Sequence, residues 1–259
     1  MNKDNLDGTQ EQFGYEWERY NEIVPKYKIQ FQKWIYPFEL KNFIGKSFID
    51  AGCGIGRNSF WPLEAGAESC LAFDFDHRTI KVAKNNLQQF KNVDIKYLSI
   101  YDLDINSKYE IAFSIGVIHH LKHPAKAVEK LYKSLKKDGK LIIWVYAKEG
   151  NEMKLLFLRP IRYFTTKLPL GLTKLISKLI TYAVWLFLRI YSRSPYLKLM
   201  KTFSFRHTES IIFDQLIPKI ANYWTKNEVL DLLDGLKVRN IEIHHTNEMS
   251  WTLICEKDI

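Results

Sequence analysis

The feature that most constrains this chain is a glycine turn at residues 47–57, with the sequence SFIDAGCGIGR. A short apolar run ends in Asp50, glycines follow at positions 52, 54 and 56, and an amphipathic helical pattern begins directly afterwards. Glycine lets the backbone adopt positive φ and lets a ligand lie against bare main chain. The amides at the start of the next helix would point at a negative group. Such a strand, turn and helix in an alternating β/α chain is typical of a nucleotide-type cofactor site.

The glycine spacing separates two kinds of cofactor. The dinucleotide fingerprint is G-x-G-x-x-G, but here the third glycine comes one residue early and Arg57 stands where a dehydrogenase has Gly or Ala. The order Asp50-x-Gly52-x-Gly54-x-Gly56 instead resembles the first motif of the class I methyltransferases that use S-adenosylmethionine. The resemblance implies that these four residues belong to an S-adenosylmethionine site.

Strand and helix patterns alternate through the first half of the chain. Apolar runs predict strands over 47–51, 70–73, 93–98, 111–115 and 140–146, and amphipathic patterns predict helices over 58–65, 77–90 and 124–137. Strands separated by helices of this length indicate parallel pairing with right-handed crossovers. Near the end, Thr225 and Glu228 form a capping box that predicts a helix start, and 238–244 with 250–256 predict an antiparallel hairpin.

This order resembles the class I methyltransferase fold, an α/β doubly wound, mostly parallel sheet of seven strands. The resemblance covers about 48–145 and 223–257. It implies a seventh strand inserted antiparallel between strands five and six. Outside the resemblance, the amphipathic pattern from Met153 to about Arg206 predicts a helical insertion after strand five. We expect an N-terminal helical cap over 1–44, a cofactor-binding core over 45–150 and 209–259, and the insertion over 151–208.

Asp74 follows the second strand, 22 positions past Gly52. A carboxylate there can accept both ribose hydroxyls of an adenosine, and Phe75 would then lie beside the adenine. The alternative is that Asp74 caps the helix before His77. The order and spacing of the glycine turn and this acid favour the ribose role.

Two further strand ends carry residues whose roles follow from the resemblance. Ser99 and Ile100 close the third strand, where related methyltransferases usually carry an Asp that reads the adenine amino group. A serine hydroxyl brings no charge, and Asp102 could replace it by another loop path. The segment after the fourth strand resembles the family's, which implies that the main chain from Ser114 to Gly116 lines the methionine end of the cofactor.

Three more side chains are candidates around the cofactor. Arg57 lies in the first turn of a helix, where the dipole disfavours a cation, and could bind the methionine carboxylate; a plain surface arginine is the alternative. In related methyltransferases a leading aromatic helix often closes the site, which implies a cap carrying Tyr15 or Trp17. A helix that only packs on the core is the alternative there.

His119 and His120 are the candidate general bases, because histidine titrates near neutrality and can take a proton from an acceptor group. Either one could instead be structural. The His119-His120-x-x-His123 spacing also raises a metal site, but a sulfonium methyl donor needs no Lewis acid, so we expect no metal. The segment resembles that of ubiquinone-pathway O-methyltransferases, which carry acidic residues where Gly116 and His119 stand here.

The positive charge is concentrated in one segment. The chain has a net charge of +9, and residues 153–208 hold eleven Lys or Arg and no Asp or Glu, which leaves 27 basic and 29 acidic residues elsewhere. The amphipathic pattern of this segment fits either a lid over the site or an element on an anionic membrane surface. Its longest uncharged stretch, Leu179–Leu188, falls short of the about 20 residues that cross a bilayer, so we expect no span.

Cellular location and partners follow from composition. Cys53, Cys70 and Cys255 have no metal or disulfide spacing, the first twelve residues lack an apolar signal core, and we expect a cytoplasmic protein, peripheral to the membrane at most. No RNA-reading signature appears, so we expect no nucleic-acid partner. The oligomeric state stays open.

The sequence therefore predicts an S-adenosylmethionine-dependent methyltransferase acting on a small, hydrophobic or lipid-linked acceptor, at oxygen, with Tyr146 among the substrate contacts. Two alternatives remain. One is a nicotinamide-dependent reductase, since Tyr132 and Lys136 show the Tyr-x-x-x-Lys spacing. The other is a non-catalytic, membrane-associated protein that binds the cofactor.

Overall fold

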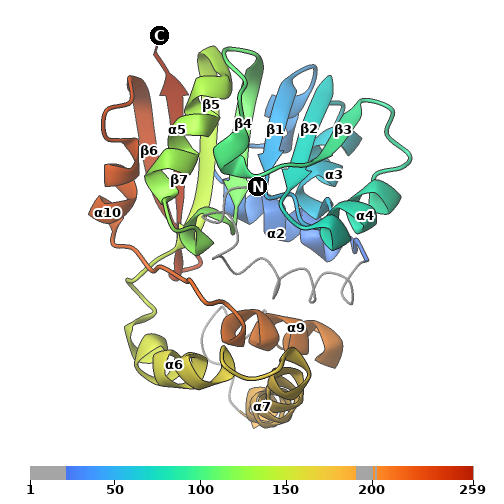
Figure 1. Ribbon diagram of the computed structural model, residues 1–259, viewed down its shortest axis with the longest axis vertical. Helices are drawn as coiled ribbons and strands as arrows, with labels where there is room; N and C mark the ends of the chain where they lie inside the picture. Colours follow the sequence, from blue (N-terminus) through green and yellow to red (C-terminus); the bar gives the residue numbers. More distant parts are fainter. Residues whose placement is uncertain (1–21, 191–200, 202, 259) are drawn as a thin grey trace.

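A computed structural model describes residues 22–190, 201 and 203–258 of the chain. Figure 1 shows an upper layer, a twisted sheet covered by helices on both faces, and a lower layer of helices below one edge of that sheet. The sheet has seven strands in the order β3-β2-β1-β4-β5-β7-β6. Their bounds are β1 Ser47–Ala51, β2 Ser69–Asp74, β3 Val93–Tyr97, β4 Tyr109–Ile115, β5 Leu135–Tyr146, β6 Val238–Thr246 and β7 Ser250–Lys257.

The pairing directions confirm the predicted fold class. The strands from β1 to β5 pair in parallel, and β7 runs antiparallel between β5 and β6. The central strands are buried on both faces, which explains their nearly unbroken apolar sequences. Strand β5 begins five residues earlier than predicted, at Leu135, because the helix before it ends at Ser134.

Helices cover both faces of the sheet. They are α2 Lys26–Ile35, α3 Arg57–Glu64, α4 His77–Asn86, α5 Pro124–Ser134 and α10 Lys226–Leu230, with 3-10 turns η2 Leu40–Phe43, η3 Ile100–Asp102, η4 Ile118–His120 and η5 Asp231–Leu233. The predicted capping box is present, since Thr225 Oγ1 accepts from the Glu228 N–H and the Glu228 carboxylate accepts from the Thr225 N–H. Two apolar clusters, one on each face, form the core.

A group of aromatic side chains holds the N-terminal helices to the sheet. Phe31 of α2 and Phe43 of η2 meet Phe48 of β1 and Phe113 of β4, and each of the four is fully buried. The rings of Phe48 and Phe113 stack with centroids 5.6 Å apart. Because α2 also reaches the edge where the parallel strands end, this contact helps to place its other residues beside the site described below.

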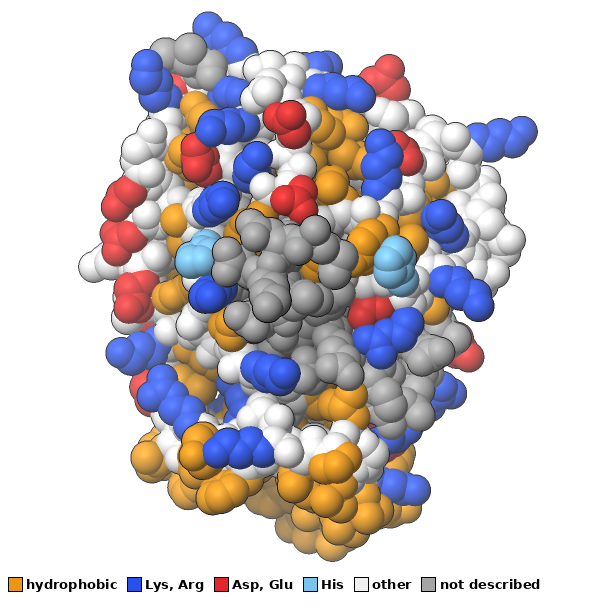
Figure 2. Space-filling model, in the orientation of Figure 1, with side chains coloured by type: hydrophobic (Ala, Val, Ile, Leu, Met, Phe, Trp, Pro, Cys, Tyr) orange, Lys and Arg blue, Asp and Glu red, His pale blue; other side chains and the backbone are white. Residues whose placement is uncertain are grey.

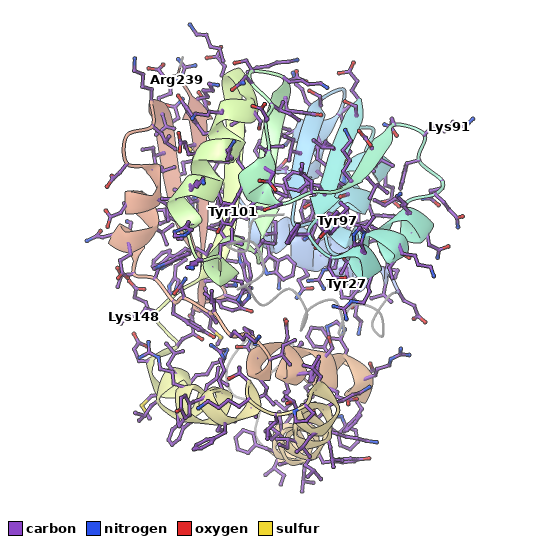
Figure 3. The ribbon with its side chains drawn as sticks, viewed as in Figure 1. Tyr27, Lys91, Tyr97, Tyr101, Lys148 and Arg239 are labelled. Atoms are coloured by element: carbon purple, nitrogen blue, oxygen red, sulfur yellow. The ribbon has the colours of Figure 1, made fainter. Side chains whose placement is uncertain are left out.

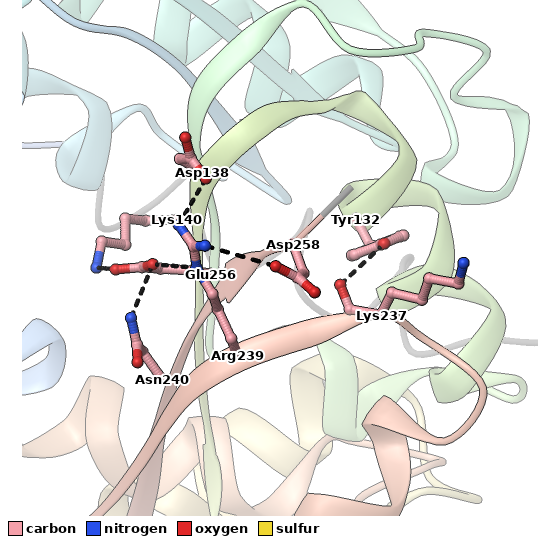
Figure 4. A network of polar contacts seen from close by, with 8 residues as sticks. All are labelled: Tyr132, Asp138, Lys140, Lys237, Arg239, Asn240, Glu256 and Asp258. Atoms are coloured by element: carbon pink, nitrogen blue, oxygen red, sulfur yellow. Dashed lines mark hydrogen bonds and ion pairs between the residues drawn. The ribbon is translucent and has the colours of Figure 1, made fainter.

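A polar network stabilises the far end of the sheet. Arg239 of β6 donates to Glu256 of β7 at 3.0 Å and to Asp138 at 2.6 Å, and Lys140 of β5 also pairs with Glu256. Figure 4 shows these side chains joining the β5–β7–β6 strands. The hydrogen bond from Lys140, together with those from Arg239 and Asn240, lowers the pKa of Glu256 to about 2.

The lower layer consists of α6 Glu152–Thr165, α7 Leu170–Ile190 and α9 Phe205–Leu216. Helix α9 lies between α7 and the sheet (Figure 1), and it crosses the boundary that the sequence predicts at residue 208. Among the described residues, one helical segment, Leu170–Leu188, has the length and mean hydropathy of 1.3 that a membrane crossing requires. Only Lys174 and Lys178 interrupt this segment, and the expectation that it does not cross a membrane stays a prediction.

We predict that the aromatic group is a main source of stability. Phe113→Ala should lower the free energy of unfolding by about 3–5 kcal/mol, because it removes a buried ring and leaves a cavity. Ile241→Ala, on the exposed side of β6, is the matched control and should cost less than about 1 kcal/mol. Urea denaturation of both variants measures this, and similar losses in the two would contradict the prediction.

Candidate active site

One large cavity lies at the edge where the parallel strands end. Its volume is about 490 Å³, and its walls come from the loops after β1, β2, β3 and β4, from the end of β5, and from helices α2, α6 and α9. Carboxyl ends of parallel strands are where α/β sheets bind ligands. The lining includes ten of the predicted site residues: Gly52, Gly54, Arg57, Asp74, Phe75, Ser99, Ile100, Gly116, His120 and Tyr146.

The glycine turn has the backbone that its sequence requires. Gly52 has a φ of +77°, and a Cβ at this position would lie 2.4 Å from the side chain of Val117. Gly52 therefore lets the loops after β1 and β4 meet. Gly56, at φ +81°, serves the packing of α3 on α4, because a Cβ there would strike Leu87 at 2.8 Å; it does not line the cavity.

Asp74 is fixed by the main chain around it. Its Oδ2 accepts from the Gly54 N–H at 2.9 Å, and its Oδ1 accepts from the Asp76 N–H at 3.1 Å. Burial raises its pKa to about 6, so the carboxylate is still largely ionised near neutral pH. The helix cap that competed for this role belongs to Asp76, whose side chain accepts from the Arg78 N–H. Asp74 is thereby left to face the cavity.

Two predicted site residues support the site from beneath. Asp50 is buried, accepts from Ser59 Oγ at 2.6 Å, and so ties β1 to α3. Burial raises the pKa of Asp50 to about 7, and its Oδ1 has no hydrogen-bond partner among the described residues. Ser114 is also buried and donates to the Ala51 carbonyl at 2.9 Å, so it links β4 to β1. Neither residue lines the cavity.

Aromatic rings from the first described helix cover the side of Arg57. The Arg57 guanidinium lies 5.1 Å from the Tyr27 ring and 5.5 Å from the Trp34 ring. Tyr27, labelled in Figure 3, also meets His207 of α9 at 5.6 Å, so the cap and the lower layer touch at the cavity wall. The predicted cap residues Tyr15 and Trp17 lie outside the described residues. The spacing of Tyr27 and Trp34 on one amphipathic helix was a signal that could have identified them.

Of the residues that the sequence predicts beside the adenine, Phe75 and Ser99 line the cavity and Asp102 does not. Phe75 lines the cavity and stacks on Tyr97 with centroids 5.1 Å apart. Ser99 also lines it, but its hydroxyl accepts from the Tyr101 N–H at 3.3 Å and thus caps η3. Asp102 is exposed and does not line the cavity.

The two histidines are in different positions. His120 lines the cavity, and its Nδ1 lies 2.7 Å from the Ile220 carbonyl oxygen. His119 is fully buried behind it, does not line the cavity, and neither ring nitrogen has a partner among the described residues. Burial lowers both pKa values, that of His120 to about 4. A catalytic role for either residue stays a prediction.

Sequence reasoning missed the polar side chains contributed by the lower layer. Lys154 of α6, and Asp214 and Gln215 of α9, line the cavity. Gln215 donates to the Tyr146 hydroxyl at 3.2 Å. Burial, and then the charge of Arg162, lower the pKa of Lys154 to about 8. Only the tertiary structure brings these residues to the strand ends, because their spacing in the sequence after β5 follows no motif that would predict it.

The reductase alternative finds no support in this geometry. The Tyr132 hydroxyl donates to the Lys237 carbonyl, and Lys136 lies 3.9 Å from Glu110. Neither residue lines the cavity. Within the described residues, no group of three or more His, Cys, Asp or Glu side chains is arranged to hold a metal ion.

Comparisons with known proteins find a methyltransferase domain in part of the chain. Residues 49–143 match the family described as a methyltransferase domain. The chain is 34% identical over 104 residues to a tRNA U34 carboxymethyltransferase of Helicobacter pylori, a match that covers 38% of this chain and 40% of the relative. The chain spans between 36% and 44% of the length of such curated relatives.

Solved structures share the fold over nearly the whole chain. An S-adenosylmethionine-dependent methyltransferase structure from Listeria monocytogenes has a TM-score of 0.50 and 16% identity, covering 93% of this chain and 97% of that one. Human N-acetylserotonin methyltransferase in complex with SAM has a TM-score of 0.58 and 12% identity, covering 97% and 57%. Residues 49–143 are therefore similar to a methyltransferase domain, and the chain shares the fold of methyltransferases that use S-adenosylmethionine.

The residues present fit this cofactor. Each Asp74 oxygen holds one main-chain N–H and keeps a lone pair with which to accept a ribose hydroxyl. Gly52 and Gly54 expose main chain at the wall, and Arg57 can bind a carboxylate. These are the groups that would hold S-adenosylmethionine.

We predict that Asp74→Asn raises the Kd for S-adenosylhomocysteine about 10- to 100-fold, because a charged hydrogen-bond acceptor is lost. Calorimetry measures this, with Asp102→Asn as the matched control that should leave the Kd unchanged. In the unsubstituted protein, binding should weaken as the pH falls through about 6, where Asp74 takes up a proton. Equal effects of the two substitutions would contradict the assignment.

A second prediction concerns Asp50, whose folded pKa of about 7 is above its ordinary value of 3.8. Between these values the folded state holds a proton that the unfolded state releases, so this group lowers stability as the pH rises. The stability of Asp50→Asn relative to the unsubstituted protein should therefore increase by up to about 1.4 kcal/mol per pH unit in this window. Comparison of two denaturation series cancels the opposite contribution of the histidines, and a pH-independent difference would refute the prediction.

Proposed function

We propose that this protein transfers a methyl group from S-adenosylmethionine to the oxygen of a hydrophobic or lipid-linked hydroxyl compound in the cytoplasm. The observation that carries the proposal is the continuity of the cavity. The same cavity is lined by the glycine turn and Asp74 and by His120, Tyr146 and Gln215. When bound, S-adenosylmethionine supplies a methyl group that is already activated on a sulfonium.

His120 is the proposed general base. The Ile220 carbonyl can only accept, so Nδ1 carries the proton and the lone pair of the neutral ring is on Nε2. The pKa of about 4 keeps the ring neutral near pH 7, in the form that can take a proton from a hydroxyl. His119 packs against Tyr146 with centroids 3.9 Å apart, which supports a role in positioning.

The acceptor end of the cavity supports a largely apolar substrate with one polar contact region. Ile211 of α9, Trp144 and Met249 are among the apolar side chains that line the cavity. The Tyr146 hydroxyl, held by Gln215, and the ammonium of Lys154 add polar groups. Apolar walls with a few placed polar groups are usual for sites that orient small hydrophobic ligands.

The acceptor class can be tested directly. The protein is incubated with radiolabelled S-adenosylmethionine and, in separate reactions, an organic-solvent extract of bacterial membranes and total tRNA. We expect label in the lipid fraction that mild base does not remove, since an ether survives where an ester is cleaved. Label in tRNA instead would favour an activity like that of the Helicobacter relative and contradict the proposal. Binding of S-adenosylhomocysteine without any transfer would favour the non-catalytic alternative.

With an acceptor in hand, His120→Asn should lower kcat about 100-fold or more while leaving the Kd for S-adenosylhomocysteine unchanged. His119→Asn is the matched control, because it changes the neighbouring buried ring and should alter stability more than kcat. Steady-state kinetics and calorimetry measure the two effects. A loss of kcat in His119→Asn without one in His120→Asn would contradict the role proposed for His120.

A further inference from the structure

Helix α7 packs with its small polar face inward and its large apolar face outward. Thr173, Ser177 and Thr181 recur every fourth residue and are fully buried. Their hydroxyls are satisfied by main-chain carbonyls of Thr165, Lys174 and Ser177 at 2.7–3.0 Å. A helix of a water-soluble layer is expected to bury the opposite face.

The outward face of the lower layer is a continuous apolar surface. On α7 it includes Leu175, Leu179 and Leu186, which are 55%, 63% and 60% exposed. The remaining large apolar side chains exposed on the two helices are Met153, Leu156, Phe157, Ile161, Tyr163 and Phe164 of α6, and Leu172, Tyr182, Phe187 and Ile190 of α7. Figure 2 shows hydrophobic side chains gathered over this end of the molecule. We call these residues the apolar base.

The lid over the cavity is α9, not the apolar face of α7. His207, Ser210 and Ile211 of α9 line the cavity, whereas no residue of α7 does. On its other side, α9 packs against α7 through Phe205, whose ring lies 4.6 Å from that of Tyr182. Of the two alternatives left open for the insertion, the cavity lining therefore gives a covering position to α9 and none to α7.

Charge identifies what covers the apolar base. Arg159, Lys167 and Lys178 are exposed on this layer, and the segment 153–208 has no acidic residue, so two copies meeting through this face would bring like charges together. Lysines at its margin, such as Lys167 and Lys178, are exposed. Figure 2 shows basic side chains along the upper rim of the same end. An apolar face bordered by cations complements an anionic lipid surface.

We propose that the apolar base docks this protein on the surface of an anionic membrane, with α6 and α7 lying in the interface. Helix α6 connects this surface to the cavity: Lys154 lines the cavity, while the neighbouring Met153 and Phe157 are exposed in the base. The proposal explains why α7 has the composition of a crossing helix although its small face is packed against α9. It stands independently of the reaction, since it rests on the surface alone.

Sedimentation with vesicles tests the proposal without cofactor or acceptor. The full chain should bind vesicles of phosphatidylcholine mixed with phosphatidylglycerol and bind pure phosphatidylcholine vesicles less. Leu179→Glu combined with Leu186→Glu should weaken binding about a hundredfold. The matched control is Ile44→Glu with Ile241→Glu, two exposed apolar residues of the sheet layer, which should leave it unchanged.

A second pair of variants tests the contribution of charge. Lys167→Gln with Lys178→Gln should weaken binding to the anionic vesicles about tenfold, whereas Lys81→Gln with Lys84→Gln on exposed positions of α4 should have no effect. Urea denaturation confirms that each variant is folded, so the result does not depend on the proposed function. Equal vesicle binding by the apolar-base variant and its control would overturn the proposal. So would protein that alkaline carbonate fails to release from membranes, or a dimer that the same substitutions dissociate.

Discussion

The arrangement of the whole site depends on one hydrogen-bonded junction, in which the Gly54 N–H donates to the Asp74 carboxylate. It joins the turn after β1 to the end of β2, and the positive φ of Gly52 brings Val117 from the loop after β4 against the same turn. Because β1, β2 and β4 are parallel, their carboxyl ends meet at one edge, so a single turn can order three loops. The wall of the cavity that contains Gly52, Gly54 and Asp74 follows from that convergence.

Burial sets the charge along this cavity. It raises the pKa of Asp74 to about 6 and lowers that of Lys154 to about 8, so both groups are mainly charged near pH 7, whereas His120 with a pKa of about 4 is neutral. Holding ionised groups away from water lowers stability, and the usual place to find such groups is a functional site. Burial has the same effect on Asp50 beneath the turn, where it raises the pKa of the carboxyl group to about 7.

The helices of the lower layer have different surroundings: α9 lies against the cavity, and α7 has a large exposed face. Helix α9 faces the cavity and supplies polar side chains to it, while α7 contributes its small residues to the packing and leaves its leucines outside. The burial of Thr173, Ser177 and Thr181, with Leu175 and Leu179 left exposed, is the packing on which the proposed membrane docking rests. The basic charge of the same segment makes the outward face suited to an anionic lipid layer.

The sequence by itself determined the sheet, its parallel order, the glycine turn and the position of Asp74, because each depends on local periodicity, turn chemistry or a fixed spacing along the chain. The Thr225–Glu228 capping box and the antiparallel hairpin could also be predicted from the sequence, because both depend on residues close together in the chain. Only the tertiary structure decided that Tyr27 and Trp34 flank Arg57, that His120 rather than His119 faces the cavity, and that α9 covers it. Those contacts join segments far apart in the chain, and which face of an amphipathic helix is buried depends on the surface it meets.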